Sequence, residues 1–298
     1  MAGTDGSGDE MAAARPRRDV SDVAGQPAME LRDIGVRYGG VAALDRVSFS
    51  VKPGEILGII GSNGAGKTTL FDVCSGFLAA DSGRVLLWGR DITALPAAER
   101  AEHGMGRIFQ DARLFPSLTV SENVAVAFER HIEVREPIAC MLKIGSTNES
   151  EYHLRRQVEA LTKQMGLERY RDAFVSELST GTRRIVEIAC AMAHRPSLLL
   201  LDEPTSGVAQ RESEAMARLV LRLHEDTGTT FVIIEHDVPM LSSISDRLVC
   251  MDLGHVIAEG DPADVLADPL VISSYLGADD TAIQRSDNRG SRLSSQMT

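Results

Sequence analysis

Short apolar segments along the chain have the length and composition of buried β-strands. Residues 55–60, 198–201 and 230–234 are largely apolar runs, and the second consists of four consecutive leucines. Four leucines in a row are typical of a parallel-sheet strand that is buried on both faces, because no polar position alternates with the apolar ones. Residues 29–36 form a further strand-like segment. The pattern predicts a sheet to which distant parts of the chain contribute.

A different periodicity marks a helix in residues 183–194. Two stripes of apolar residues recur there at the three- and four-residue spacing of an α-helix. The first stripe consists of Ile185, Ile188, Ala189 and Met192, and the second of Val186, Cys190 and Ala193. Since both stripes are apolar, we expect this helix to be largely buried.

Local signals predict further helices and their ends. Residues 119–122 (Thr-Val-Ser-Glu) form a capping-box pattern that opens a helix running to residue 130, and residues 152–165 form another helical segment. The Gly-Ser-Thr-Asn cluster at 145–148 predicts a loop. Asp261 followed by Pro262 predicts a helix start, with the aspartate as N-cap and the proline in the first turn.

Length and composition limit the class of protein. The 298 residues suffice for one large domain or two modest ones, and no internal repeat is visible. The 43 acidic against 31 basic residues disfavour nucleic acid as the main partner. No apolar run approaches the roughly 20 residues of a membrane-spanning helix, and the N-terminus lacks the apolar segment of a secretory signal. We expect a cytosolic protein with disordered tails at 1–28 and 278–298.

Four cysteines are widely separated and form no CxxC pair. This spacing favours small buried thiols in a reducing cytosol over a disulfide framework or a metal site. The four are Cys74, Cys140, Cys190 and Cys250.

A glycine-rich loop lies between the strand-like residues 55–60 and the helix-like residues 70–74, and it matches the GxxxxGK[ST] phosphate-loop pattern in its required context. Three glycines let successive N–H groups point at one anion, and the following helix N-terminus adds partial positive charge. Lys67 can reach the β- and γ-phosphates of a nucleotide, and the Thr68 hydroxyl can ligate Mg²⁺. The loop comprises Gly61, Ser62, Asn63, Gly64, Ala65, Gly66, Lys67, Thr68 and Thr69. The flanking strand and the Lys-Thr-Thr sequence favour a nucleoside-triphosphate site over a simple helix-capping turn.

Two adjacent acids, Asp202 and Glu203, end the four-leucine strand. The carboxyl ends of strands are where α/β sheets place their ligands. Asp202 would hold Mg²⁺ through its water shell, and Glu203 could align and deprotonate the water that attacks the γ-phosphorus. The alternative is a polar strand end without catalytic function.

Other polar positions are weaker candidates. His236 follows the strand 230–234 and could contact the γ-phosphate and the catalytic water, while Gln110 could sense Mg²⁺ and water. Tyr38 could stack on adenine. Ser179 and Gly181 lie at the start of the 183–194 helix, where a second anion could bind. Taken singly, a structural histidine and an ordinary capped helix are the simpler interpretations.

Together, and in this order along the chain, these features resemble the ABC-type ATPase cassette. The family's six motifs are an aromatic loop, Walker A, a glutamine loop, a signature, Walker B and a histidine switch. Their counterparts here are Tyr38, residues 61–68, Gln110, residues 178–182, residues 198–203 and His236. The resemblance covers roughly residues 29–277. Residues 38–44, 107–115, 258–266 and 275–277 are most similar to the ATPase subunits of branched-chain amino-acid importers.

The resemblance implies an α/β fold of the P-loop NTPase class. It consists of an ABC-type ATPase core with a mixed sheet, an antiparallel β-subdomain and a helical subdomain. The helical subdomain, about residues 111–195, would be inserted between the core segments 29–110 and 197–277. The tails 1–28 and 278–298 would lie outside this single ATPase domain.

The resemblance also implies partners. Two cassettes meet head to tail with two ATP molecules between them, so that Ser179 and Gly181 serve the nucleotide of the partner cassette. ATP hydrolysis with Mg²⁺ then drives transmembrane permease subunits, with a solute-binding protein as a further partner. The chain would be cytoplasmic and peripheral on the inner face of the plasma membrane.

Three positions depart from the family pattern. Thr180 replaces a frequent glycine or aromatic residue, Thr182 stands where glutamine is usual, and Ala209 stands where an aspartate commonly helps to couple the two sites. We therefore hypothesise that the chain pairs with a different cassette and forms unequal sites. Two rival functions remain, a soluble ABC protein acting on ribosomes, DNA or cofactor assembly, and an inactive regulatory cassette.

Overall fold

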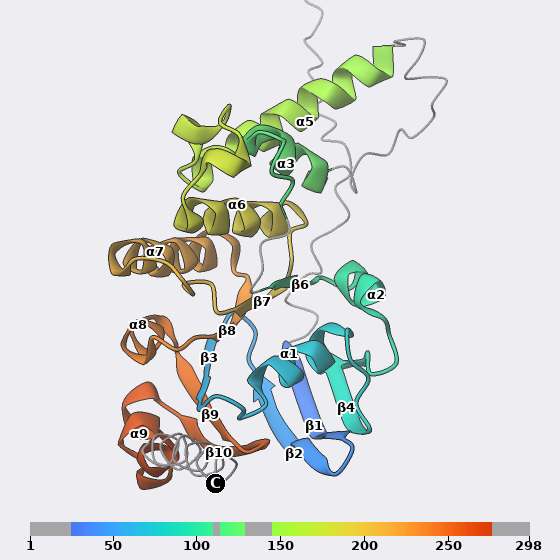
Figure 1. Ribbon diagram of the computed structural model, residues 1–298. Coiled ribbons are helices and arrows are strands. Elements are labelled where there is room, and N and C mark those ends of the chain that lie inside the picture. The colour runs from blue at the N-terminus through green and yellow to red at the C-terminus, as the bar shows by residue number, and fades with distance from the viewer. Residues whose placement is uncertain (1–24, 110–113, 129–144, 276–298) are drawn as a thin grey trace, which may run out of the picture.

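The computed structural model describes residues 25–109, 114–128 and 145–275, and its core is a six-stranded sheet in the order β10-β9-β3-β8-β7-β6 (Figure 1). Neighbouring strands pair in parallel, except that β9 and β10 pair antiparallel. The strands are β3 (Ile56–Gly61), β6 (Met105–Ile108), β7 (Leu198–Asp202), β8 (Thr230–Ile234), β9 (Arg247–Asp252) and β10 (His255–Gly260). The mixed sheet implied by the family resemblance is thus confirmed.

The apolar runs of the sequence form the middle of this sheet. β3, β8 and β7 are neighbours in it, and every residue of the three strands is buried. Because the strands run parallel, their carboxyl ends reach the same edge, where the glycine-rich loop lies beside Asp202, the last residue of β7, and Glu203, which follows it.

An antiparallel sheet packs beside this core, in the order β2-β1-β4-β5. Its strands are β1 (Met29–Tyr38), β2 (Val41–Val51), β4 (Ser82–Leu87) and β5 (Arg90–Asp91). Ala28, the last residue of the predicted N-terminal tail, is already buried and donates its N–H to the carbonyl of Val51. Between β4 and β5, the indole N–H of Trp88 donates to the hydroxyl of Ser197, 3.0 Å away, and so joins this sheet to the start of β7.

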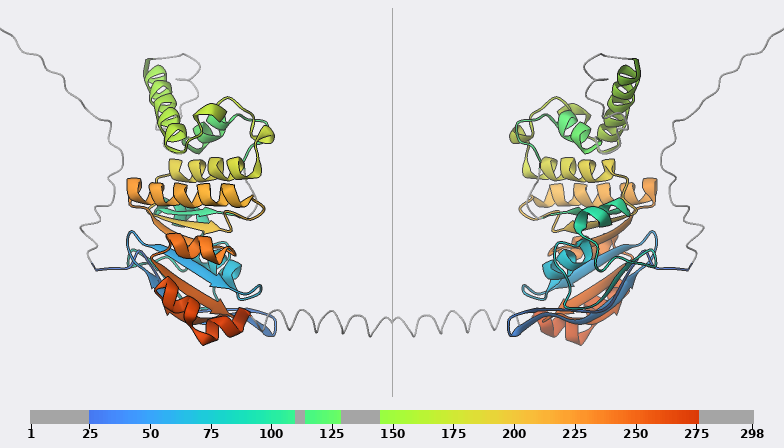
Figure 2. Two further views of the ribbon diagram at one scale, coloured as in Figure 1. Left: turned by 90° about the vertical axis from the view of Figure 1, so that its left-hand side faces the viewer. Right: turned by 90° about the vertical axis from the view of Figure 1, so that its right-hand side faces the viewer.

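One apolar cluster fills the space between the antiparallel sheet, helix α1 (Lys67–Ser75) and one face of the core sheet. A second cluster covers the other face, with α6 (Thr180–Ala193), α7 (Gln210–Thr227) and α8 (Val238–Ile244). Figure 2 shows α6 and α7 side by side next to the sheet, with α3 (Val120–Phe128) and α5 (Gly145–Gln164) beyond them. The remaining short elements are α2 (Ala97–Glu102), α9 (Pro262–Ala267) and the 3₁₀ turns η3 (Glu168–Tyr170) and η4 (Val175–Glu177).

The predicted helix ends are confirmed where the structure describes them. At the start of α3, a carboxylate oxygen of Glu122 accepts from the N–H of Thr119 at 2.7 Å, and the Thr119 hydroxyl accepts from the N–H of Glu122 at 3.2 Å. This is a complete capping box. Asp261 likewise caps α9 by accepting from the N–H of Ala263. The predicted helix at 183–194 starts three residues earlier, at Thr180, and buries most of both apolar stripes.

One local prediction is wrong. The cluster at 145–148 is not a loop but the first turn of α5, which runs from Gly145 to Gln164. Serine, threonine and asparagine are poor in helix interiors because they compete for backbone hydrogen bonds, but they are well tolerated at a helix start. A long helix also extends at little cost, since each added residue gains one hydrogen bond.

Several predicted features lie outside the described residues. These are Gln110, Cys140, the tail 278–298 and nearly all of the tail 1–28. Within the described residues, none of the helices combines the length and the apolarity that crossing a bilayer requires. Cys74, Cys190 and Cys250 are free thiols, and burial raises their pKa values to about 12, 12 and 11.

Candidate functional site

The glycine-rich loop joins the end of β3 to the start of α1, as predicted (Figure 1). Gly66 has a φ of 98°, in the left-handed region, and a Cβ at this position would lie 2.5 Å from the carbonyl oxygen of Ala43. A side chain here would therefore be strained and would collide with backbone. The two glycines before it in the motif, Gly61 and Gly64, also have positive φ.

Lys67 points back over this loop. Its Nζ donates to the carbonyls of Gly61, at 2.6 Å, and Ser62, at 3.0 Å, and the residue is 6 % exposed. Burial lowers the pKa of Lys67, while the nearby carboxylates of Glu203 and Asp202 act in the opposite direction. The ammonium group is thus held inside the loop, where it would meet phosphate oxygens.

Asp202 ends β7 beside a buried arginine that the sequence analysis did not single out. Arg107, in strand β6, donates to Asp202 at 3.0 Å and to Asp72 of α1 at 2.6 Å. Burial raises the pKa of Asp202, and the hydrogen bond and charge of Arg107 oppose that shift. Arg107 therefore connects three elements around the acid that we expect to face the metal.

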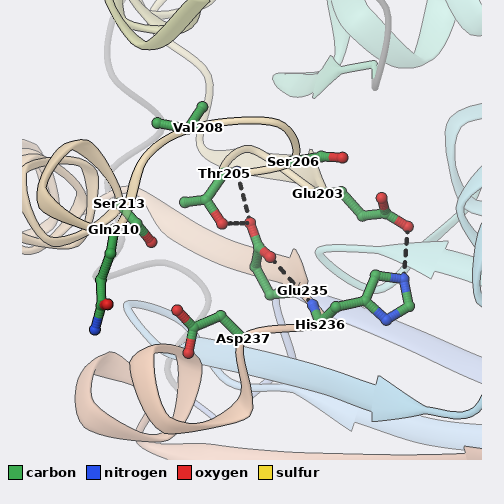
Figure 3. A pocket seen from close by; sticks show the side chains of 9 residues that line it. All are labelled: Glu203, Thr205, Ser206, Val208, Gln210, Ser213, Glu235, His236 and Asp237. Atoms are coloured by element: carbon green, nitrogen blue, oxygen red, sulfur yellow. Dashed lines mark hydrogen bonds and ion pairs between the residues drawn. The ribbon is translucent and has the colours of Figure 1, made fainter.

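Glu203 and His236 face each other across the ends of β7 and β8 (Figure 3). The Nε2 of His236 lies 3.0 Å from Oε1 of Glu203, within hydrogen-bond distance. Glu203 has a φ of 47°, which is rare for a residue with a side chain, and its N–H donates to the carbonyl of Ile234. The predicted base and the predicted histidine switch are thus brought together.

Glu235, between β8 and His236, is a buried carboxylate that the sequence analysis gave no function. One of its oxygens accepts from both the N–H and the hydroxyl of Thr205, and the other accepts from the N–H of His236 (Figure 3). A pocket of about 440 Å³ opens between the loops that carry these residues. It lies beside Glu203 and His236, not over the glycine-rich loop.

Ser179 and Gly181 form a separate group at the start of α6. Ser179 is the N-cap of this helix, since its hydroxyl accepts from the N–H of Thr182 at 3.2 Å. The same hydroxyl lies 3.1 Å from a carboxylate oxygen of Glu212 in α7, and a Cβ on Gly181 would meet that carboxylate. Among the described residues, no hydrogen bond connects this group to the glycine-rich loop. The chain's own carboxylate therefore occupies the anion position that the sequence predicts.

The structure shows less of the other three predicted residues, Tyr38, Thr68 and Gln110. Tyr38 is the last residue of β1, two residues beyond the predicted strand, and its side chain is exposed. Thr68 is exposed on the first turn of α1. Gln110 lies outside the described residues. The sequence signal that could have identified Arg107 is a charged residue inside the short strand-like segment 105–109, since an arginine that becomes buried there requires acidic partners.

Family models match two parts of the chain. One described as "ABC transporter" matches residues 44–206, and one described as "Branched-chain amino acid ATP-binding cassette transporter" matches residues 255–281. The chain is 33 % identical over 252 residues to the high-affinity branched-chain amino acid transport ATP-binding protein BraF of Pseudomonas aeruginosa. It is 34 % identical over 253 residues to the corresponding LivG protein of Escherichia coli K12. Each alignment covers 85 % of this chain and 98 % of the relative.

Solved structures show the same fold. A nucleotide-free ATP-binding cassette from an ABC transporter superposes with a TM-score of 0.71 at 31 % identity, over 84 % of this chain and 99 % of the other. The ADP conformation of the cassette MJ1267 gives 0.71 at 32 % identity, over 85 % and 99 %. The fold and the site define a P-loop ATPase of the ATP-binding-cassette type. The chain belongs to the ABC transporter family, as one of its ATP-binding subunits.

Proposed function

We propose that this chain is the ATP-hydrolysing motor subunit of an importer for branched-chain amino acids or a similar small solute. The observation that carries the hydrolytic part is the convergence of Lys67, Asp202, Glu203 and His236 at one edge of the sheet. The cargo rests on the C-terminal family match and on the names of the relatives.

Each residue of the loop and the strand ends has a distinct task in this proposal. The backbone N–H groups of residues 61–69 and the ammonium of Lys67 bind the phosphates, and Tyr38 stacks on adenine. Glu203 orients the attacking water and takes its proton, and His236 contacts the γ-phosphate. Because these groups are fixed before the reaction, positioning and charge stabilisation supply most of the rate.

Mg²⁺ is the metal that these residues would hold. The carboxylate of Asp202, the hydroxyl of Thr68 and the amide oxygen of Gln110 are hard oxygen donors, which suit this ion. When bound, Mg²⁺ neutralises charge on the β- and γ-phosphates.

A second cassette completes the site in this proposal. Ser179 and Gly181 would bind the γ-phosphate of the partner's ATP, and closure of the pair would move permease subunits at the inner face of the plasma membrane. We also propose that residues 29–277 form one domain with its helical subdomain at about 111–195. We also propose pairing with a different cassette, because Ala209 stands where an aspartate commonly helps to couple the two sites.

Transport measurements test the proposal. Cells that depend on this gene are compared after replacement by wild type, Glu203→Gln and the control Glu225→Gln, which makes the same change at an exposed position of α7. We expect uptake of radiolabelled leucine with wild type and the control but not with Glu203→Gln, and co-purification of the chain with permease subunits from solubilised membranes. Uptake that is independent of the gene would refute the proposed cargo. A chain found only on ribosomes or DNA would favour the soluble alternative.

A further inference from the structure

Glu235 is the most completely hydrogen-bonded carboxylate near the predicted base. The residue is 4 % exposed, and its two oxygens accept three hydrogen bonds from groups of two different loops. The bonds from the N–H and the hydroxyl of Thr205 are both 2.7 Å long, and the bond from the N–H of His236 is 3.1 Å long. All three partners donate, so an ionised carboxylate satisfies them all.

The geometry of the two strands explains what this carboxylate connects. β7 and β8 are parallel neighbours, with Asp202 opposite Ile234, so the chain leaves both strands at the same level. The loop after β7 starts with Glu203 in a left-handed conformation and continues to Thr205. The loop after β8 carries Glu235 and His236. One backbone hydrogen bond, from the N–H of Glu203 to the carbonyl of Ile234, joins the two strand ends, and Glu235 joins the two loops beyond it.

We propose that Glu235 is a positioning residue for ATP hydrolysis, which holds the loop of Glu203 against the loop of His236. This inference rests on the proposed role of Glu203 as the base. One carboxylate oxygen of Glu235 binds Thr205, two residues after Glu203. The other oxygen binds the backbone N–H of His236. The two loops are thus joined twice, by the hydrogen bonds of Glu235 and by the 3.0 Å contact between Glu203 and His236 (Figure 3).

Glutamine cannot replace Glu235, because the three donors around this side chain require two accepting oxygens. The amide of Glu235→Gln has one accepting oxygen, so its NH₂ group must face either the two donors of Thr205 or the N–H of His236. Either orientation places donor against donor and leaves buried groups unsatisfied. Burial raises the pKa of Glu235, whereas the hydrogen bonds from Thr205 and His236 lower it.

The expected effect is a loss of turnover without a loss of nucleotide binding. A shift of a catalytic group by about 1 Å is enough to slow a reaction about 100-fold. Among the described residues, no hydrogen bond connects Glu235 to Lys67 or to the glycine-rich loop, so nucleotide affinity should be kept. We expect Glu235→Gln to lower the single-turnover rate about 10- to 100-fold.

The experiment uses the full-length chain co-purified with its partner subunits, in excess over γ-³²P-labelled ATP and at saturating Mg²⁺. Single-turnover rates and fluorescent-ATP affinities are measured for wild type, Glu235→Gln, Thr205→Val and Thr205→Ser. Valine removes the hydroxyl and keeps the N–H, whereas serine keeps both donors and is the matched control. We expect Thr205→Ser to match wild type, Thr205→Val to be slower, and the double variant with Glu235→Gln to be no slower than Glu235→Gln alone.

A spectroscopic signal separates positioning from general stability. The ¹⁵N signals of the His236 imidazole, assigned by their absence in His236→Asn, should shift in Glu235→Gln, because the contact to Glu203 is loosened. Normal turnover in Glu235→Gln, or a parallel loss of affinity and turnover, would overturn the inference. If Glu235→Gln does not fold, equal rates for Thr205→Val and Thr205→Ser overturn it, and unequal rates support it.

Glu203→Gln is measured in parallel to separate a failure of the proposed base from a failure of the positioning role of Glu235. If Glu203→Gln turns over like wild type, the proposed role of the base fails, and the role of Glu235 fails with it. If Glu203→Gln is inactive and Glu235→Gln is normal, only the inference about Glu235 fails.

Discussion

Replacing Arg107 by methionine is the sharpest test of how the site is built. Methionine keeps much of the volume but removes both donors to Asp202 and Asp72. The side chains of Arg107 and Asp202 are 5 % and 6 % exposed, so the remaining Asp202 carboxylate would be buried without its partner. Removing one member of a buried ion pair typically costs about 3–5 kcal/mol. Asp72 is 35 % exposed and can be solvated, so we expect the lower end, about 3 kcal/mol.

The loss should depend on pH in a direction set by Asp202. Burial already raises the pKa of this carboxyl, and Arg107 opposes that shift. Without Arg107 the pKa in the folded state rises further, while in the unfolded chain it keeps its ordinary value of about 3.9. The ionised carboxylate then destabilises the fold at pH values above its raised pKa. As the pH falls through that pKa the group binds a proton in the folded state, so this part of the loss shrinks, and it is gone once the pH is below the unfolded-state value.

Urea unfolding of the full-length chain at pH 8 and pH 5 measures both effects. Each variant is compared with wild type at the same pH. Arg32→Met is the control, because Arg32 pairs with Glu30 at the surface, and little change is expected there. A loss below about 1 kcal/mol at pH 8 would show that Arg107 is not needed to compensate Asp202. A loss that does not shrink at pH 5 would show that the cost has another origin, such as packing.

Three further substitutions test separate parts of the site. Lys67→Ala should weaken nucleotide binding because it removes the charge held inside the loop, and unchanged affinity in a fluorescent-ATP titration would contradict this. Glu203→Gln should still bind ATP but turn over about 10²- to 10³-fold more slowly in a phosphate-release assay, and near-normal turnover would exclude this residue as the base. Glu212→Gln removes the carboxylate that contacts Ser179, so ATP-dependent dimerisation should need less ATP by light scattering. An unchanged or higher ATP requirement would count against a competition between Glu212 and phosphate.

The sequence predicted the strands of the core sheet and the position of the phosphate loop well, because both follow from local patterns. Four leucines in succession require burial on both faces, and β7 is buried throughout. The glycines of the phosphate loop and the capping box of α3 are similarly local. The family resemblance then supplied the order of the remaining elements.

The partners of buried charges could not be predicted, because they come from elements far apart in the chain. Arg107 meets Asp202 across 95 positions, and Thr205 meets Glu235 across 30. Rules based on the spacing of neighbouring residues, such as those for helices and turns, do not detect pairs this far apart in the sequence. The mistaken loop at 145–148 has a different cause, since composition alone does not show that a following helix extends backwards over weak helix formers.

The chain contains a single tryptophan, Trp88. Its indole N–H donates to the hydroxyl of Ser197, just before the strand that ends in Asp202. Tryptophan fluorescence, excited selectively at wavelengths that tyrosine does not absorb, therefore comes from one place, the contact between the antiparallel sheet and the core. Any rotation of one sheet against the other would break or strain that bond and change the emission. Trp88 is thus an intrinsic fluorescent probe of movement between the two sheets, and it can be followed in real time without an added label.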